Sequence, residues 1–458
     1  ATLGGPIIKD KLFFFVAYEE FDQSNPIDDG PAGAGFANEF DSVTTDIAND
    51  IASLVDQQFG FPTGTIGRQN ASENRRILAR IDWFITEKHQ LAFTYNRERE
   101  DNIEPDSLTA NFGTFAFQEN FENEGTESDL FSGRLFSQWT DNLSTELRFS
   151  RLDVNDIQDP VGGGEAQDAE PIPQVVVGVS EDEVVLGSGP GIFRSANQLD
   201  NTIDLFTAIA DYTWETPDFG THNFKVGYEW QRAETFNLFV INATGRLNFA
   251  DRDALAAGDV SSGTRTPFFP NSNADELLAG NVAGFFGNGS ATGDITDAAA
   301  EFKRSIHALF IQDEWEPTAN LTVTAGLRYD FYESNDRPDA NALFEERFGF
   351  SNATGFDNFD VLQPRFGVNY DAPWSFYGQT SFRAGAGVFS GGDPTVFFSN
   401  AFSNSGNKIG FGSTAAPECD GFDTDSLVGP DGFAGVPECV RQQQQTEAQQ
   451  GDGRVDAI

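Results

Sequence analysis

The feature of this sequence that most constrains its fold is a period-two alternation of apolar and polar side chains over long segments. Leu321, Val323 and Leu327 fall on one face of an extended chain. Thr322 and Arg328 fall on the other, because successive side chains of a β-strand point to opposite sides. Similar segments predict about eleven strands, near 10–20, 75–85, 90–98, 128–139, 143–153, 200–214, 221–236, 303–316, 321–333, 360–370 and 378–390.

These segments have the length of strands that cross a membrane. Each spans roughly 9–16 residues, whereas a tilted strand needs about 9–11 residues to cross a bilayer. The longest apolar run, 12–18, has the length of a strand and is too short for a transmembrane helix. If the chain meets a membrane, it must therefore do so as a β-barrel, since only helices and closed barrels satisfy the backbone in lipid.

Short and long connections alternate strictly along the chain. The short ones are 86–89, 140–142, 215–220, 317–320 and 371–377; the long ones are 21–74, 99–127, 154–199, 237–302, 334–359 and everything after 390. An up-and-down barrel with tight turns on one rim and long loops on the other gives this order. The predicted fold class is all-β: an antiparallel up-and-down transmembrane β-barrel with long extracellular loops. We expect 1–390 to form the barrel, and 391–458 to be an outer loop and polar tail.

Five of the six tryptophans lie at the same end of the predicted strands. Each lies just before a short turn or inside one: Trp83, Trp139, Trp214, Trp315 and Trp374. Aromatic rings with a polar edge gather at membrane–water boundaries. We therefore expect these residues to form a periplasmic-side aromatic girdle, with ordinary packing near strand ends as the alternative.

The composition excludes some classes of partner. The chain has 72 acidic and 28 basic residues, for a net charge of −44. This balance repels phosphate backbones, so nucleic acid is not an expected partner. It suits either solubility in a salty setting or the binding of cations. The chain also contains no Met and opens without a recognisable signal peptide, so we expect it to be an internal segment of a longer protein.

Three strings in this pattern resemble TonB-dependent outer-membrane receptors of the Oar-like type. They are LGGPIIKDKLFFF at 3–15, FIQDEWEPTANLTVTAGLRYD at 310–330, and QPRFG at 363–367 followed by FRAGAGVF at 382–389. The resemblance implies a 22-stranded barrel, a plug domain inside it, and an inner-membrane TonB-type complex that supplies energy through the plug region. This sequence departs from the family because no plug precedes Ala1 and only about half of the strands are present.

The resemblance makes a nutrient importer the first functional hypothesis. The chain would be the barrel portion of a receptor that takes up a scarce nutrient or metal complex. A structural or adhesive outer-membrane barrel without transport is the second hypothesis, and an acidic, secreted β-rich binding protein is the third. The expected location is the outer membrane, with lipid and an unidentified small ligand or peptide as partners.

No motif in the sequence indicates an enzyme or a cofactor. The three histidines, His89, His222 and His307, lack the spacing of a metal site or a catalytic base. Asp420, Asp423 and Asp425 lie close together and could hold calcium. However, the glycine and terminal Glu of a helix-loop-helix calcium site are missing at the required spacing.

Three further expectations concern individual residues. Leu321, Val323, Leu327 and Tyr329 should face lipid, with Thr322, Thr324, Arg328 and Asp330 facing the lumen. The only two cysteines, Cys419 and Cys439, each follow Pro-Glu in a predicted extracellular loop and should form a disulfide. Ligand contacts should come from the long-loop rim and the lumen. Finally, the sheet should be open, with 10–20 and 378–390 as its free edges.

Overall fold

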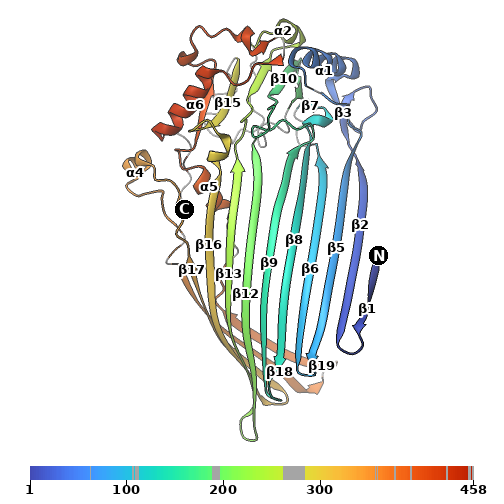
Figure 1. The fold of residues 1–458 in the computed structure, drawn as a ribbon, viewed down its shortest axis with the longest axis vertical. Coiled ribbons are helices and arrows are strands. Elements are labelled where there is room, and N and C mark those ends of the chain that lie inside the picture. The colour runs from blue at the N-terminus through green and yellow to red at the C-terminus, as the bar shows by residue number, and fades with distance from the viewer. Residues whose placement is uncertain are drawn as a thin grey trace.

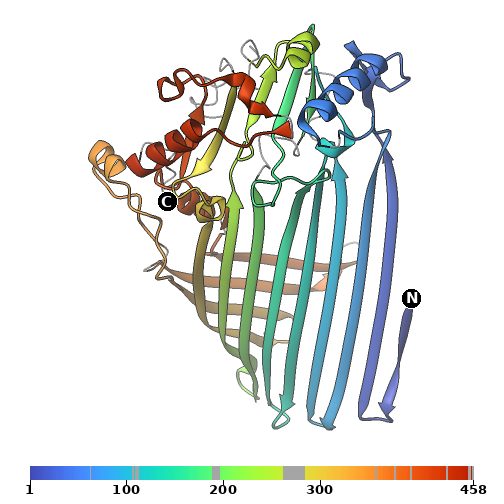
Figure 2. The same ribbon diagram turned by 45° about the horizontal axis from the view of Figure 1, so that its top comes forward.

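The computed structural model shows a tall, curved antiparallel sheet with a folded cap at one end (Figures 1 and 2). The structure describes residues 1–458 except 62, 106–107, 109–112, 188–195, 261–283, 356, 358, 376–377, 392–394, 430–431, 452–454 and 456–458. None of the helices in the described part of the chain is long and apolar enough to span a membrane.

The large sheet has twelve strands, and their order in the sheet is their order in the chain. They are β1 (Thr2–Ile8), β2 (Leu12–Pro26), β5 (Gln69–Thr86), β6 (His89–Glu104), β8 (Glu122–Gln138), β9 (Leu143–Pro160), β12 (Asn197–Thr216), β13 (Gly220–Phe239), β16 (Ala300–Thr318), β17 (Leu321–Glu333), β18 (Asp360–Ser375) and β19 (Gln379–Gly387). Each neighbouring pair is antiparallel. The all-β, up-and-down prediction is confirmed.

The predicted strand number was wrong by one. β1 was missed because its residues, which include Gly4, Gly5 and Pro6, show no period-two alternation. β1 pairs with β2, for example Leu3 with Val16, so the strand predicted at 10–20 is not an edge.

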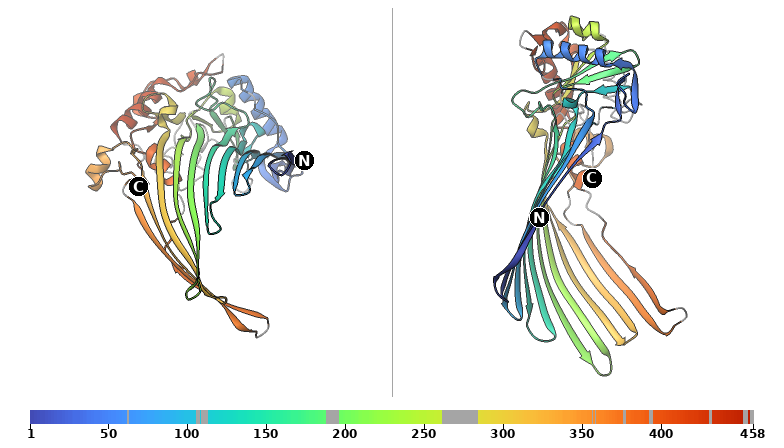
Figure 3. Two further views of the ribbon diagram at one scale, coloured as in Figure 1. Left: turned by 60° about the horizontal axis from the view of Figure 1, so that its bottom comes forward. Right: turned by 90° about the vertical axis from the view of Figure 1, so that its right-hand side faces the viewer.

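The sheet is open, as expected, and its edges are β1 and β19. The edge predicted at 378–390 is confirmed as β19, whereas the edge predicted at 10–20 is replaced by β1. No ladder joins these two strands in the part of the chain that the structure describes. Figure 3 shows the sheet curving through space while its two edge strands remain apart.

The two faces of the sheet differ in polarity and in exposure. Register pairing places Leu327 beside Ile311, and Ile311 beside Val226, on one face. Large side chains on this face are half exposed, as at Leu309, which is 52% exposed. On the opposite face Asp330 is only 3% exposed, because side chains converge on the concave side of a curved sheet. The polar face is therefore the concave one, and the predicted inward and outward sets of β17 lie on opposite faces.

The long connections and the segment after 390 fold into a cap, which the sequence did not predict. A second sheet has the order β20-β15-β14-β10-β11-β7 and contains both parallel and antiparallel pairs. Its strands are β7 (Thr114–Ala116), β10 (Gln174–Val179), β11 (Asp182–Leu186), β14 (Arg246–Phe249), β15 (Phe285–Ser290) and β20 (Ile409–Ser413).

Short helices and hairpins complete the cap. These are β3 (Asp29–Ala32), β4 (Asn38–Thr44), α1 (Thr45–Phe59), η2 (Gln118–Asn120), α2 (Arg252–Ala257), η3 (Ile295–Ala298), α4 (Ala342–Phe348), α5 (Thr395–Ser403), η4 (Pro417–Cys419), η5 (Thr424–Leu427), β21 (Val428–Gly429), β22 (Gly432–Phe433) and α6 (Glu438–Gln450). The polar run 442–450 is thus part of a helix and not an irregular tail.

Helix α1 shows how local sequence builds the cap. The Thr44 hydroxyl accepts a hydrogen bond from the Ile47 amide at 3.3 Å and so caps the first turn. Gly60 ends the helix in the left-handed region, at φ 72°. Between them, Ile51 and Val55 lie one turn apart and are fully buried in the apolar core of the cap.

The cysteines tie the C-terminal part of the cap together. Cys419 in η4 and Cys439 in α6 form a disulfide, with their Cα atoms 5.4 Å apart. Cys419 lies in the same apolar core as Val440. The bond therefore fixes α6 to the body of the cap.

Candidate functional site

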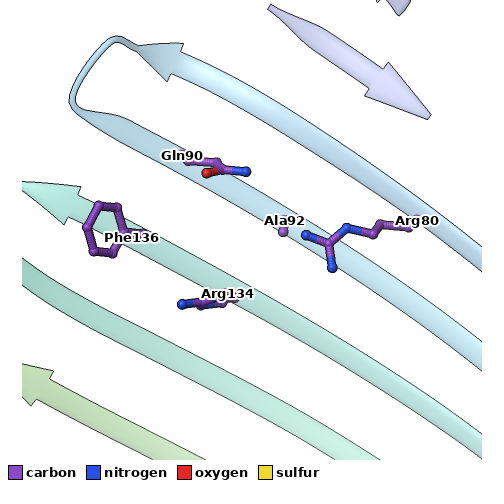
Figure 4. Close-up of a pocket in the computed structure, with 5 residues that line it drawn as sticks. All are labelled: Arg80, Gln90, Ala92, Arg134 and Phe136. Carbon is purple, nitrogen blue, oxygen red and sulfur yellow. The ribbon is translucent and has the colours of Figure 1, made fainter. Parts of the chain in front are cut away.

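The concave face of the sheet carries a set of ion-paired arginines, and two hollows lie among them. The first hollow, of about 240 Å³, lies on β5, β6 and β8 and is shown in Figure 4. Arg80, Gln90 and Arg134 supply its hydrogen-bond donors, while Ala92 and Phe136 supply apolar surface. Gln90 pairs with Phe136 and Ala92 with Arg134, while Arg80 pairs with Thr94, two positions after Ala92 on the same face; the period-two pattern therefore places all five side chains on one face.

Carboxylates hold the two arginines of this hollow in place. Arg80 makes a forked contact with Asp82, with Nε–Oδ2 at 2.8 Å and Nη2–Oδ1 at 2.7 Å. Arg134 donates to Glu146, which also accepts from Arg148 at 3.0 Å. The forked contact fixes the planar guanidinium of Arg80, and the contact with Glu146 restrains Arg134; both leave further N–H donors available for a ligand.

The second hollow, of about 170 Å³, lies across β13, β16, β17 and β18. Its charged residues are Lys225, Arg328 and Arg365. Arg328 bridges two strands, since it donates to Asp330 at 2.7 Å and to Glu229 at 3.0 Å. Positive groups therefore recur along the concave face of a protein with a strongly negative net charge.

Helix α5 narrows the concave side at the long-loop end. Its Phe402 stacks on Phe302 of β16, with ring centroids 4.8 Å apart. Its Ser399 accepts a hydrogen bond from Asn237 of β13 at 2.7 Å. The segment after 390 thus packs against the inner wall as well as within the cap.

Three of the predicted girdle tryptophans lie at the turn end of the apolar face. Trp83 lies opposite Leu91, and the rings of Trp214 and Trp315 stack on the two sides of His222, each with ring centroids 5.5 Å from it. Trp139 follows the end of β8, and Trp374 lies near the end of β18. All five tryptophans therefore lie at the short-turn rim.

The structure brings no metal site together. Among the described residues, no three His, Cys, Asp or Glu side chains are placed to hold a metal ion. Asp420 and Asp423 flank the turns η4 and η5, and the side chain of Asp425 lies outside the described residues. His222 contacts Asp313 at 2.8 Å, and its ring stacks on those of Phe224 and Trp315.

One buried acid in the cap has an unusual environment that the sequence did not reveal. Glu165 is 6% exposed, and its Oε1 atom has no hydrogen-bond partner, while Oε2 accepts from Gln167 at 2.9 Å. Burial raises the pKa of this carboxyl to about 8, and the nearby negative charges of Asp159 and Asp168 add to the rise. Glu165 is therefore protonated at neutral pH.

Comparison with known proteins identifies the family. The family described as "Outer membrane beta barrel domain" matches residues 36–452, which is most of the chain. No curated protein sequence matches the chain.

Several solved structures are similar to this chain at low identity. The outer membrane transporter YddB from Escherichia coli is 11% identical, with a TM-score of 0.49, over 90% of this chain and 43% of its own. A mutant of the ferric enterobactin receptor PfeA from Pseudomonas aeruginosa is 14% identical, with a TM-score of 0.45, over 90% of this chain and 44% of its own. The siderophore receptor PirA from Acinetobacter baumannii is 14% identical, with a TM-score of 0.40, over 81% of this chain and 37% of its own.

The chain therefore spans less than half the length of these structures. The family match agrees with the alternating strands, the apolar outer face and the two kinds of rim described above. The chain belongs to the outer membrane beta barrel domain family and lies in the outer membrane.

Proposed function

We propose that this chain is the barrel portion of a TonB-dependent receptor that imports a scarce nutrient or metal complex. The observation that carries the proposal is the concave face, where arginines held by carboxylates recur from β5 to β17 beneath a folded cap. A wall of this kind offers an anionic ligand successive binding positions from the long-loop rim towards the turn rim. The resemblance of the strings at 3–15 and 310–330 to Oar-like receptors supports the same function.

The proposal includes further strands that complete the barrel. The edges β1 and β19 carry backbone groups whose partners would have to come from another part of a complete wall, since unpaired groups are not tolerated in hydrocarbon. An energy-coupled importer would also need a plug inside the wall and the TonB-type inner-membrane complex. We therefore include the plug and the TonB-type complex in the proposed function.

A second candidate function is adhesion, and the cap favours it. Its buried core and its disulfide make the cap a rigid head at the outer surface, a form that suits binding to other surfaces. The third possibility, a secreted acidic protein, is set aside because members of this family reside in the outer membrane.

Uptake measurements separate the two remaining candidates. The intact outer-membrane protein would be produced in cells that lack their own siderophore receptors, with radiolabelled ferric siderophores as the first probes. We expect accumulation inside the cells that stops when TonB or the proton gradient is removed. Surface binding of cells without any accumulation would overturn the importer and support adhesion.

A pair of variants tests the wall itself. Replacing Arg80 and Arg134 with Gln removes both charges from the first hollow, and we expect a loss of uptake of about tenfold or more. The matched control replaces the same two residues with Lys, which keeps the charge, and should retain more of the uptake. Equal uptake by all three proteins would remove this hollow from the ligand path.

A further inference from the structure

The concave face of the wall carries a patch of aliphatic side chains near the middle of its strands. The patch lies on the adjacent strands β8, β9 and β12, at alternate positions that point to the lumen. We define the aliphatic patch as Leu130, Leu152, Val154, Ile203 and Leu205. The interior of a membrane barrel is ordinarily polar, so formation of the wall alone does not require these side chains.

Register pairing shows that the patch is continuous. Leu130 is the partner of Leu152, which is also the partner of Ile203. Val154 and Leu205 lie on the same face, on either side of this row. All five side chains are partly exposed, and none belongs to the buried apolar clusters of the described residues. The patch is therefore an apolar surface that faces the lumen.

Cations lie directly on the turn side of the patch. From the patch towards the turns, the next inward residues are Ser150 and Arg148 on β9, and Ser132 and Arg134 on β8. Arg134 and Arg148 are register partners, and both contact a single carboxylate, that of Glu146. Like charges directly opposite each other are unfavourable, and one carboxylate offsets only one of the two. This group therefore keeps a net positive charge and favours the binding of an anion.

The two guanidinium groups are restrained but reachable. The side chains of Arg134 and Arg148 are 46% and 45% exposed, whereas that of Glu146 is 18% exposed. Arg134 also lines the first hollow, beside Phe136 (Figure 4). Bonds from arginine to a carboxylate are often bidentate and fix the orientation of the bound group. A ligand carboxylate can thus be held at the turn side of the patch.

The spacing between the cations and the patch limits the shape of the ligand. Arg148 and Leu152 are four positions apart on β9, which corresponds to a rise of about 13 Å, and the hydroxyl of Ser150 lies between them. On the cap side of the patch, the next inward charged residue of β9 is Asp156. This acid disfavours the reverse orientation of an anion. A ligand that fills both zones is therefore elongated, with its anionic group towards the turns.

We infer that this part of the inner wall binds an amphiphilic carboxylate, a molecule with one carboxylate and an extended aliphatic chain. The carboxylate accepts hydrogen bonds from Arg134 and Arg148. The chain lies along the aliphatic patch, where both apolar surfaces are removed from water. The inference rests on the proposed import function, since it assigns a chemical class to a ligand of the same wall.

The test uses decanoate that carries a photoreactive diazirine near the end of its chain. The intact outer-membrane protein in lipid vesicles is illuminated with this probe, and the labelled positions are mapped by mass spectrometry. Decanol with the same diazirine tests the need for the carboxylate, and unlabelled acetate as a competitor tests the need for the chain. A chain dissolved in the bilayer labels the outer face, so only labels on inward residues of β8, β9 and β12 are counted.

We expect saturable labelling of the aliphatic patch that unlabelled decanoate displaces and acetate does not. Arg134→Gln with Arg148→Gln should weaken binding of the probe about tenfold or more, because bonds between charged groups are lost. The matched control is Arg97→Gln with Arg151→Gln, which removes outward, ion-paired arginines that are 43% and 48% exposed. The control should bind the probe as the unmodified protein does. Equal labelling by decanol, or unchanged labelling of the test variant, would overturn the inference.

A second variant covers the case in which loss of both arginines prevents insertion. Leu152→Thr with Ile203→Thr keeps every charge and should weaken binding about five- to tenfold, because the chain meets less apolar surface. Unchanged binding in this variant would contradict the contact with the patch.

Uptake of ferric siderophores by the same proteins reports on the proposed function separately. Siderophore uptake without labelling of the patch by decanoate would overturn the amphiphile site alone. Labelling of the patch without uptake of siderophore or decanoate would support the site and overturn the importer.

Discussion

The barrel wall and the cap are held together in opposite ways. The strands of the wall are joined by continuous ladders such as β12–β13, and large apolar side chains such as Leu309 lie half exposed on its outer face. Apolar clusters on its inner side are small, as where Phe302 packs against Phe402. The cap has a closed core in which side chains such as Phe115 and Val176 are buried. Lipid covers the apolar side chains of the wall, whereas the apolar side chains of the cap are buried by other parts of the cap. The two regions should therefore respond differently to the same kind of mutation.

Removing a large side chain from the cap core should have the largest effect. Phe115 is 1% exposed and packs edge-on against Phe40 and Phe117, at 5.5 and 5.2 Å. Phe115→Ala should destabilise the cap by about 3–5 kcal/mol, since it removes buried area and leaves a cavity. Proteolysis of the cap in denaturant would measure this loss, and the heat-dependent gel mobility of the barrel should not change. Phe397→Ala, at an exposed position, is the control.

The reverse experiment places a charge on the wall. Ala208 faces outward beside Tyr228 and Leu147, whereas its neighbour Thr207 faces inward beside Glu229 and Arg148. Ala208→Arg should cost about 2–4 kcal/mol because the charge meets lipid, and Thr207→Arg should cost much less. Folding of the intact barrel into vesicles from urea would measure both. Similar costs at the two positions would contradict the assignment of the faces.

Reduction of the disulfide should affect only the cap. Cys419 and Cys439 are separated by 20 positions in sequence, and closing a loop of this size contributes about 3 kcal/mol in the chain-entropy model. Replacing both with Ser should lower the denaturant midpoint of the cap and leave the insertion of the barrel unchanged. A wild-type midpoint in the double variant would show that α6 is held by its other contacts alone.

The smallest expected effect depends on pH. Glu165 has a pKa of about 8 in the folded cap, against an ordinary value of 4.5. The stability contributed by its protonated form is therefore fully present below about pH 4.5 and is lost as the pH rises through 8.

Between pH 6 and 8 the cap should lose on the order of 2 kcal/mol. Glu165→Gln should remove this slope, because the amide does not titrate, while Glu170→Gln at an exposed position of the same loop should keep it. Denaturation of the cap at several pH values would show the difference. A steep slope that survives in Glu165→Gln would assign the pH dependence to other groups.

The difference between the wall and the cap also explains how much of the structure could be predicted from the sequence. A wall strand is defined by a local pattern, so Leu321 and Arg328 were assigned to the correct faces from their neighbours alone. The cap-side ends of the strands were predicted too short, because charged side chains replace the apolar half of the pattern there, as at Arg97 and Arg99 of β6. β12, for example, was expected from 200 and begins at Asn197.

The cap could not be predicted in this way, since its sheet pairs segments that are far apart in the sequence. β7 has only three residues and pairs in parallel with β11, for example Phe115 with Val184. The local signal of this sheet is the apolar run at 175–177, followed by a second at 184–186, which resembles a short buried hairpin. The arginines of the first hollow follow the period-two rule, but only the pairing of β5, β6 and β8 brings them together.

The length of the wall strands has a consequence for backbone hydrogen exchange. β13 has 20 residues, which correspond to a rise of about 50 Å for a tilted strand, roughly twice the height of the apolar band of a membrane barrel. The half of β13 nearer the cap therefore has water on both sides, while the half nearer the turns has lipid on one. Amide protons of a single strand should then exchange with deuterium at two rates, fast at Thr235 and slow at Val226. The change from fast to slow exchange would mark the membrane surface directly on the backbone.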